Sequence, residues 1–146
     1  MLVDVVIEQR FYRCAKNKYW TENAFPYDFW TRYLDVFSEV NIVARVAEVS
    51  EPKSDWKRVD GKKVGFVDLP SYIGPWGFLK TVPQLIRSLR KRKAVKRKVI
   101  SRVPSILAEF YNIFAIPKLQ PYAVEVVGDP ADVFAVGANK SLLRPF

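Results

Sequence analysis

The sequence has 146 residues, of which 49% are hydrophobic and 14% aromatic, enough for the core of one globular domain. It contains no histidine and a single cysteine, Cys14, which excludes Ser-His-Asp and Cys-His catalysis, histidine-containing or cysteine-rich zinc sites, and an internal disulfide. The formal net charge of +9 favours an anionic partner. We expect no metal and no cofactor.

The N-terminus does not read as a signal peptide, because Met1 is not followed by basic residues and Asp4 interrupts the apolar run. No stretch of about 18 uncharged apolar residues is present, as a membrane-spanning helix would need. These features predict a cytoplasmic location.

In the first half of the chain, β-branched residues predict a buried strand at 2–7, followed by a polar and aromatic stretch at 8–27 without helical periodicity. A helix is expected to begin near Asp28, which is a good N-cap. A second strand at 40–46 precedes a charged loop at 48–63. The helix carries an apolar stripe of Phe29, Trp30, Tyr33, Leu34 and Phe37.

A third strand is predicted at 64–69, and a helical region begins at Gly74. Its apolar face consists of Phe78, Leu79, Val82, Leu85, Ile86 and Leu89. Because proline costs about 3 kcal/mol in a helix interior, we expect a break or a new first turn at Pro83.

The remaining elements are a strand at 98–103, a helix at 105–114 and a strand at 122–127. Pro104 is expected in the first turn of that helix. Strands of four to seven mostly apolar residues separated by helices predict a Rossmann-like three-layer sandwich, with a mostly parallel sheet, helices on both faces and the first strand central.

The ligand site of such a sheet lies outside the carboxyl ends of its strands. Most residues at the predicted strand ends are polar or charged, which a merely structural loop does not require. They are Glu8, Gln9, Arg10, Arg45, Asp68, Arg102, Glu125 and Asp129.

Several segments, in order and spacing, resemble the opening of bacterial family-4-like glycosyltransferases. The segments lie at 7–12, 19–21, 25–34, 43–46, 69–76, 102–105 and 121–130. The resemblance covers nearly the whole chain. Two features depart from the family pattern: the first glycine is Gly61, where many relatives have glycine after the first strand, and there is no histidine for the cleft.

The resemblance implies the N-terminal half of a two-domain GT-B enzyme. Residues 1–130 would form a Rossmann-like acceptor-side domain, and 131–146 a tail leading toward a donor domain that the chain lacks. The complete enzyme would move a sugar from a nucleotide-sugar donor to a glycan or lipid-linked glycan. The chain alone would bind no donor and transfer no sugar, because the other half carries the groups that hold the donor phosphates.

Six strand-end residues are therefore candidates for acceptor binding, and no catalytic residue is assigned. They are Gln9, Arg10, Tyr12, Arg102, Glu125 and Asp129. Arg102 can bind an acceptor phosphate in a bidentate manner, and the two carboxylates can orient sugar hydroxyls or act as a base. The alternative is that Glu125 pairs with Arg102 and Asp129 caps a turn.

A basic segment at 87–98 has eight bases in twelve residues, and 69–108 contains ten bases and no acid. It is either a solvated helix end or a face that attracts anionic lipid at the inner face of the plasma membrane. The membrane-facing candidates are Arg90, Lys91, Arg92 and Lys93. Nucleic acid is the least favoured partner, because no helix-turn-helix, zinc or RNP motif is present. The alternative function is a stand-alone α/β binding module that uses this face.

Overall fold

The computed structural model describes residues 1–92 and 97–127. Within them lie seven strands and three helices. In chain order they are β1 (Leu2–Cys14), β2 (Lys18–Thr21), α1 (Tyr27–Leu34), β3 (Glu39–Glu48), β4 (Lys57–Arg58), β5 (Val64–Pro70), α2 (Gly74–Lys91), β6 (Lys98–Val103), α3 (Ile106–Phe114) and β7 (Ala123–Val126).

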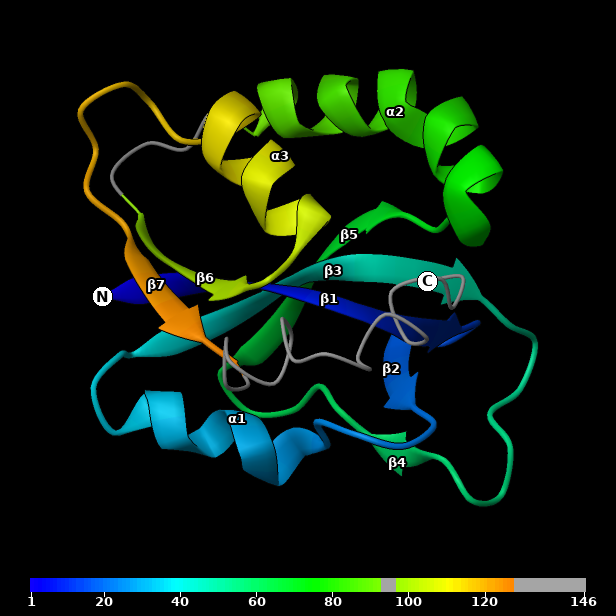
Figure 1. Cartoon of the computed structure of the whole chain (residues 1–146). Coiled ribbons are helices and arrows are strands. Elements are labelled where there is room, and N and C mark those ends of the chain that lie inside the picture. The colour runs from blue at the N-terminus through cyan, green and yellow to red at the C-terminus, as the bar shows by residue number, and fades with distance from the viewer. Residues whose placement is uncertain (93–96, 128–146) are drawn as a thin grey trace, which may run out of the picture.

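All seven strands form one sheet, and the long β1 runs through its middle (Figure 1). The first residues of β1 lie between parallel neighbours, β3 on one side and β6 on the other. The last residues of β1 still pair with β3 on one side, and on the other side they pair with β2, which is antiparallel. β5 pairs with β3 and β7 pairs with β6, both in parallel. β4 pairs with β2 and is antiparallel to it.

The predicted Rossmann-like three-layer sandwich with a mostly parallel sheet is wrong. The sheet is mixed and rich in strands, and strands and helices do not alternate along the chain. β2 follows β1 directly through a tight turn at Asn17, whose φ of 54° and N–H bond to the Cys14 carbonyl (3.0 Å) reverse the chain. The stretch expected to be an irregular loop after the first strand is instead a hairpin, which adds the antiparallel part of the sheet.

Two apolar cores lie on the two faces of the sheet. Because side chains alternate along β1, Val5 points to the face covered by α1, while Val6 points to the face covered by α2 and α3. Trp30 fills the first core and is completely buried. Leu85 and Leu89 of α2 and Tyr111 of α3 fill the second, as the stripe on α2 predicted, whereas Leu79 of the same stripe is 62% exposed.

Several predicted boundaries need correction. α2 continues through Pro83 without a break; Pro83 is exposed, so water can bond the carbonyl that its ring leaves without a partner. α1 begins at Tyr27, one residue before the expected cap Asp28, which instead places its carboxylate in the first turn. Pro104 lies before α3 and not in its first turn, and Ser105 is the N-cap, whose hydroxyl accepts the Ala108 N–H at 2.9 Å.

Candidate functional site

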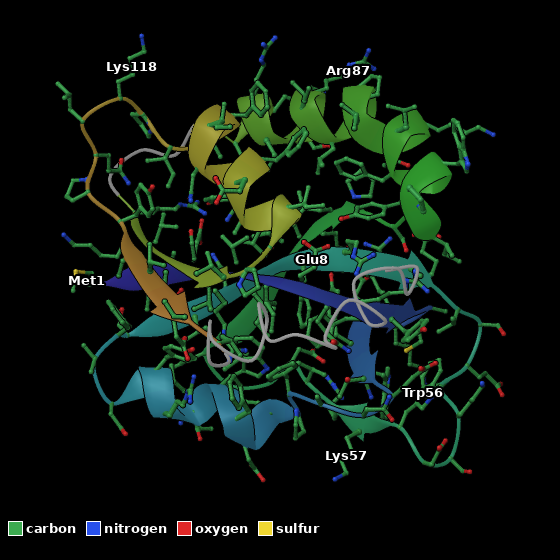
Figure 2. All side chains as sticks on the ribbon, viewed as in Figure 1. Met1, Glu8, Trp56, Lys57, Arg87 and Lys118 are labelled. Atoms are coloured by element: carbon green, nitrogen blue, oxygen red, sulfur yellow. The ribbon has the colours of Figure 1, made fainter. Side chains whose placement is uncertain are left out.

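Glu8 lies where the buried first half of β1 ends, on the side of the sheet that faces α2 and α3 (Figure 2). Its carboxylate accepts the Tyr72 hydroxyl at 2.7 Å, the Ser105 hydroxyl at 2.9 Å and the Leu107 N–H at 2.9 Å. An anion at a helix N-terminus is stabilised by the free N–H groups of the first turn. Glu8 therefore fixes the start of α3 against the sheet.

Two arginines hold the segment that joins β5 to α2. Arg10 and Arg45 both donate to the Tyr72 carbonyl, at 2.8 and 3.2 Å, and the Arg45 guanidinium lies 4.5 Å from the centre of the Tyr72 ring. The Arg45 Nε is 3.5 Å from a Glu8 oxygen. Both arginines are thus engaged in positioning Tyr72, although their Nε atoms have no hydrogen-bond partner within the described residues.

Arg102, near the end of β6, is the most distinctive polar group of this edge. The residue is 8% exposed, and its guanidinium lies 4.9 Å from the ring centre of Phe25 and 5.1 Å from that of Phe29. Its Nε is 3.4 Å from a Glu125 oxygen but makes no hydrogen bond in the part of the chain that the structure describes. Arg10, Arg45 and Arg92 also have an unpartnered Nε within the described residues, so what distinguishes Arg102 is its place in the lining of a pocket.

Glu125 is already shared between several groups. Its carboxylate accepts hydrogen bonds from the Arg32 guanidinium at 2.8 Å and from the Tyr33 hydroxyl at 2.7 Å, in addition to the ion pair with Arg102. Burial by itself raises the pKa of Glu125, but the Tyr33 hydrogen bond and the charges of Arg102 and Arg32 outweigh it, so the pKa lies below its ordinary value.

A small pocket of about 140 Å³ opens beside Arg102. It combines a guanidinium, a carboxylate and an aromatic ring with apolar walls. Its lining residues are Ile7, Glu8, Phe25, Arg102, Val103, Pro104 and Val127. These groups come from β1, the loop before α1, and the carboxyl ends of β6 and β7. The pocket can hold one anionic or hydroxyl-bearing group against an apolar surface.

A larger hollow of about 420 Å³ lies at the far end of β1, beside the hairpin turn. Its cation, Arg13, bonds both Glu48 and Asp68, the latter at 2.6 Å. Glu48, which lines the hollow, and Asp68 thus both neutralise the one arginine of its lining. Cys14 also lies here, and its pKa is lowered mainly by the Lys16 backbone N–H. We regard the pocket beside Arg102 as the candidate site because this arginine pairs with one acid, Glu125, which it shares with Arg32.

The predicted acceptor-site residues do not all meet at this pocket. Arg102 lines it and Glu125 lies against Arg102, because they are direct partners in the register of β6 and β7. Arg10 turns to the Tyr72 carbonyl, and Tyr12 stacks on Trp56 with ring centres 4.4 Å apart. Gln9 is half-buried in β1 and outside the pocket lining, and Asp129 lies outside the described residues.

The six acceptor candidates did not include Phe25, and Glu8 was placed only at a strand end. Phe25 has a φ of 67°, a left-handed conformation that the neighbouring residues do not predict. In this conformation its ring lies over the Arg102 guanidinium. Glu8 could have been found as the first charged residue after the buried run of β1. Its role as the anchor of α3, 97 residues away at Ser105, could not.

The basic segment divides into inward and outward residues. Arg90 and Lys91 are exposed at the end of α2. Arg92 reaches inward to Asp4, with its NH2 group 3.2 Å from an oxygen of that fully buried carboxylate. Arg92 thus forms a structural ion pair and is not part of an outer basic face. Lys93 lies outside the described residues.

The state of Glu125 predicts an acid-dependent loss of stability. Because the folded-state pKa is lowered, the contribution of Glu125 is present above its unfolded pKa of about 4.3 and is lost as pH falls through the folded value. Urea unfolding between pH 7 and pH 3 should show that E125Q loses less stability on acidification than the wild type.

The exposed Glu51 provides a matched control for this titration. E51Q should follow the wild-type pH profile. Parallel profiles of E125Q and the wild type would contradict the ion-pair network around Arg102.

Comparisons with known proteins identify no relative. No family model matches the chain, and no curated protein or solved structure is similar to it. Among residues 1–92 and 97–127, no helix combines the length and the apolar character needed to cross a membrane.

Proposed function

We propose that this chain is the acceptor-binding domain of a glycosyltransferase, and that an anionic group of the acceptor binds at Arg102. The observation that carries the proposal is the Arg102 guanidinium in the lining of the small strand-end pocket, held between the Phe25 and Phe29 rings. The resemblance of several segments to family-4-like glycosyltransferases favours the same assignment, although the Rossmann-like fold that it implies is not the fold of this chain. In the complete enzyme the sugar would come from a nucleotide-sugar donor and pass to a glycan or lipid-linked glycan.

The charges around the pocket favour an anion. A guanidinium offers five N–H donors, and Glu125, the carboxylate nearest to Arg102, is divided between Arg102, Arg32 and Tyr33. The charge of Glu8 is offset by Arg45, and its oxygens accept hydrogen bonds from Tyr72 and the start of α3. Neither carboxylate is left to neutralise Arg102 fully. A phosphate can accept two parallel N–H bonds from such a group, and the surrounding apolar walls would strengthen them.

The aromatic rings give the site its orientation. Phe25 and Phe29 both lie within about 5 Å of the Arg102 guanidinium, which restricts its rotation. Phe25 also lines the pocket, so the same ring that steadies the cation offers an apolar face to a sugar or lipid. The site thus combines recognition of charge with recognition of an apolar surface.

The size of the pocket fits one end of an acceptor. Its volume of about 140 Å³ is below the roughly 300–1,000 Å³ of sites that enclose drug-sized ligands. A phosphate or part of one sugar ring is of suitable size, whereas a whole nucleotide sugar is not. We therefore assign donor binding to a C-terminal domain, and we expect this chain alone to transfer no sugar from a nucleotide sugar to any acceptor.

An NMR titration of the isotopically labelled chain tests the proposed site. The probe is a water-soluble prenyl diphosphate that carries one hexose. Its addition should shift the amide signals of Phe25, Arg102, Val103 and Val127, which line the pocket. The hexose without the diphosphate should shift them less, because the ion pair with Arg102 is then missing.

The R102Q variant gives the quantitative comparison. A hydrogen bond to a charged group contributes about 1.5–3 kcal/mol, so R102Q should bind the probe roughly 10- to 150-fold more weakly. Arg58, an ion-paired arginine on the short strand β4, is the control, and R58Q should bind like the wild type. Equal affinity of R102Q and wild type, or shifts confined to the hairpin around Cys14, would contradict the assignment.

A further inference from the structure

The outward face of α2 has an apolar half and a basic half. At 100° per residue, the exposed positions of the helix fall on one stripe along its whole length. They are Pro75, Trp76, Leu79, Lys80, Pro83, Gln84, Arg87, Arg90 and Lys91. The first half of this stripe is apolar apart from Lys80, and the second half is almost entirely basic.

The apolar half is unusually exposed. Trp76 is 77% exposed and Leu79 62%, and Ile73, just before the helix, is 71% exposed. A tryptophan at such a position exposes a large apolar ring to water without a partner in the described chain, which favours an interaction surface. The three side chains lie within two turns of one another, so they can enter the same apolar medium together.

The basic half continues the same stripe. Arg87, Arg90 and Lys91 line a shallow hollow of about 470 Å³ with Pro83 and Ile86. The sequence contains no acidic residue between 69 and 108 to offset these charges. An anionic surface that covers the apolar half would therefore meet uncompensated positive charge at the other half.

The orientation of the stripe is fixed by the fold. Leu85 and Leu89 on the opposite face of α2 are completely buried in the core against the sheet. α2 lies at the outer edge of the molecule in Figure 1, and Figure 2 shows Arg87 projecting away from the sheet. Lys118 projects from the same side, and its neighbour Leu119 is fully exposed. Apolar and basic groups therefore recur on one side of the protein.

We infer that the outer face of α2 docks on an anionic lipid bilayer. Trp76, Leu79 and Ile73 enter the region between headgroups and acyl chains, and Arg87, Arg90 and Lys91 lie among lipid phosphates. Interfacial helices combine apolar residues, tryptophan among them, with lysine and arginine in this way. A nucleic acid would use the basic half but would leave the apolar half in water, so the lipid surface accounts for more of the stripe. The inference does not depend on the proposed sugar-acceptor site.

Flotation of the whole chain with lipid vesicles tests the basic half. Vesicles of phosphatidylcholine and anionic phosphatidylglycerol should carry the wild type at low salt, and binding should weaken as salt rises. The variant R87Q/R90Q/K91Q should partition onto the vesicles about 100-fold more weakly, because each base near an anionic surface contributes about 1 kcal/mol of binding free energy. The control K16Q/K57Q/K62Q removes the same charge from exposed lysines on other elements and should float like the wild type.

Fluorescence tests the apolar half. Lipids brominated on their acyl chains should quench part of the tryptophan emission of the bound protein. The W76F variant should lose that quenching, because the other tryptophans, Trp20, Trp30 and Trp56, are not on α2. The W76S/L79S variant should bind the same vesicles at least tenfold more weakly, with an unchanged circular dichroism spectrum because both side chains are exposed.

Four outcomes would overturn the inference. The first two are a wild type that does not float with anionic vesicles, and an equal loss of binding in R87Q/R90Q/K91Q and in its control K16Q/K57Q/K62Q. The other two are flotation without quenching of Trp76, and binding to DNA or RNA without binding to vesicles. Failure at Arg102 in the acceptor titration would leave these results unchanged, since Arg102 lies on β6 and not on α2.

Discussion

Replacing Asp4 by Ala is expected to lower the free energy of unfolding by about 3–5 kcal/mol, the usual cost of removing one partner of a buried ion pair. Asp4 is completely buried in β1. It accepts the Tyr111 hydroxyl at 2.7 Å and the Asn41 amide at 3.2 Å, and it forms ion pairs with Arg92 and Arg97. The substitution leaves the buried Tyr111 hydroxyl and the Arg92 guanidinium without their anion.

Urea unfolding of D4A followed by circular dichroism measures this loss. The exposed Asp55 gives the control, and D55A should change the stability by less than about 0.5 kcal/mol. The variant R92Q should also be destabilised, because Asp4 then keeps a buried charge with fewer partners. A loss below 1 kcal/mol in D4A would show that the Asp4 network does not hold β1, α2 and α3 together.

Replacing Trp30 by Ala is expected to cost about 3–5 kcal/mol of stability, as is typical of a large buried aromatic residue. Trp30 is completely buried on the α1 face, and its ring centre lies 5.0 Å from that of Phe29 and 6.0 Å from that of Tyr33. Its Nε1 donates to the Phe25 carbonyl at 2.9 Å. Truncation removes the packing of α1 and the bond that holds the loop before it.

The W30F variant separates these two effects. It keeps most of the ring and loses the bond to Phe25, so its stability should fall less than that of W30A. Its affinity for the diphosphate probe should also fall, because Phe25 is held at a φ of 67° and its ring positions Arg102. Equal unfolding energies for W30A and W30F would contradict the buried position of the ring, and an unchanged probe affinity in W30F would contradict the coupling to the site.

The parts of the fold that the sequence predicts are those with strong periodicity. The apolar run at 2–7 forms the buried part of β1, and the stripe on α2 packs Leu85 and Leu89 as expected. The second half of β1 was missed because Phe11 is its single fully buried residue, so residues 8–14 carry little alternation. The antiparallel edge was missed because β2 and β4 have only four and two residues.

The candidate site was predictable only where neighbouring strands bring residues together. Arg102 and Glu125 end adjacent strands, and parallel strands end at the same edge of a sheet. Their pairing follows from that geometry. The position of the Phe25 ring depends on a loop conformation. The inward orientation of Arg92 depends on an ion pair with Asp4, 88 residues away. Long-range contacts of this kind leave no periodic signal in the sequence.

Calorimetric titration with acceptor and donor tests the central claim most directly. The chain is titrated in parallel with the hexose-bearing prenyl diphosphate and with a nucleotide sugar, each against the wild type and R102Q. We predict heat of binding for the acceptor analogue with the wild type, at least tenfold weaker binding with R102Q, and no binding of the nucleotide sugar to either protein. Binding of the nucleotide sugar, or no difference between wild type and R102Q with the acceptor analogue, would contradict the assignment of this chain as an acceptor-binding domain.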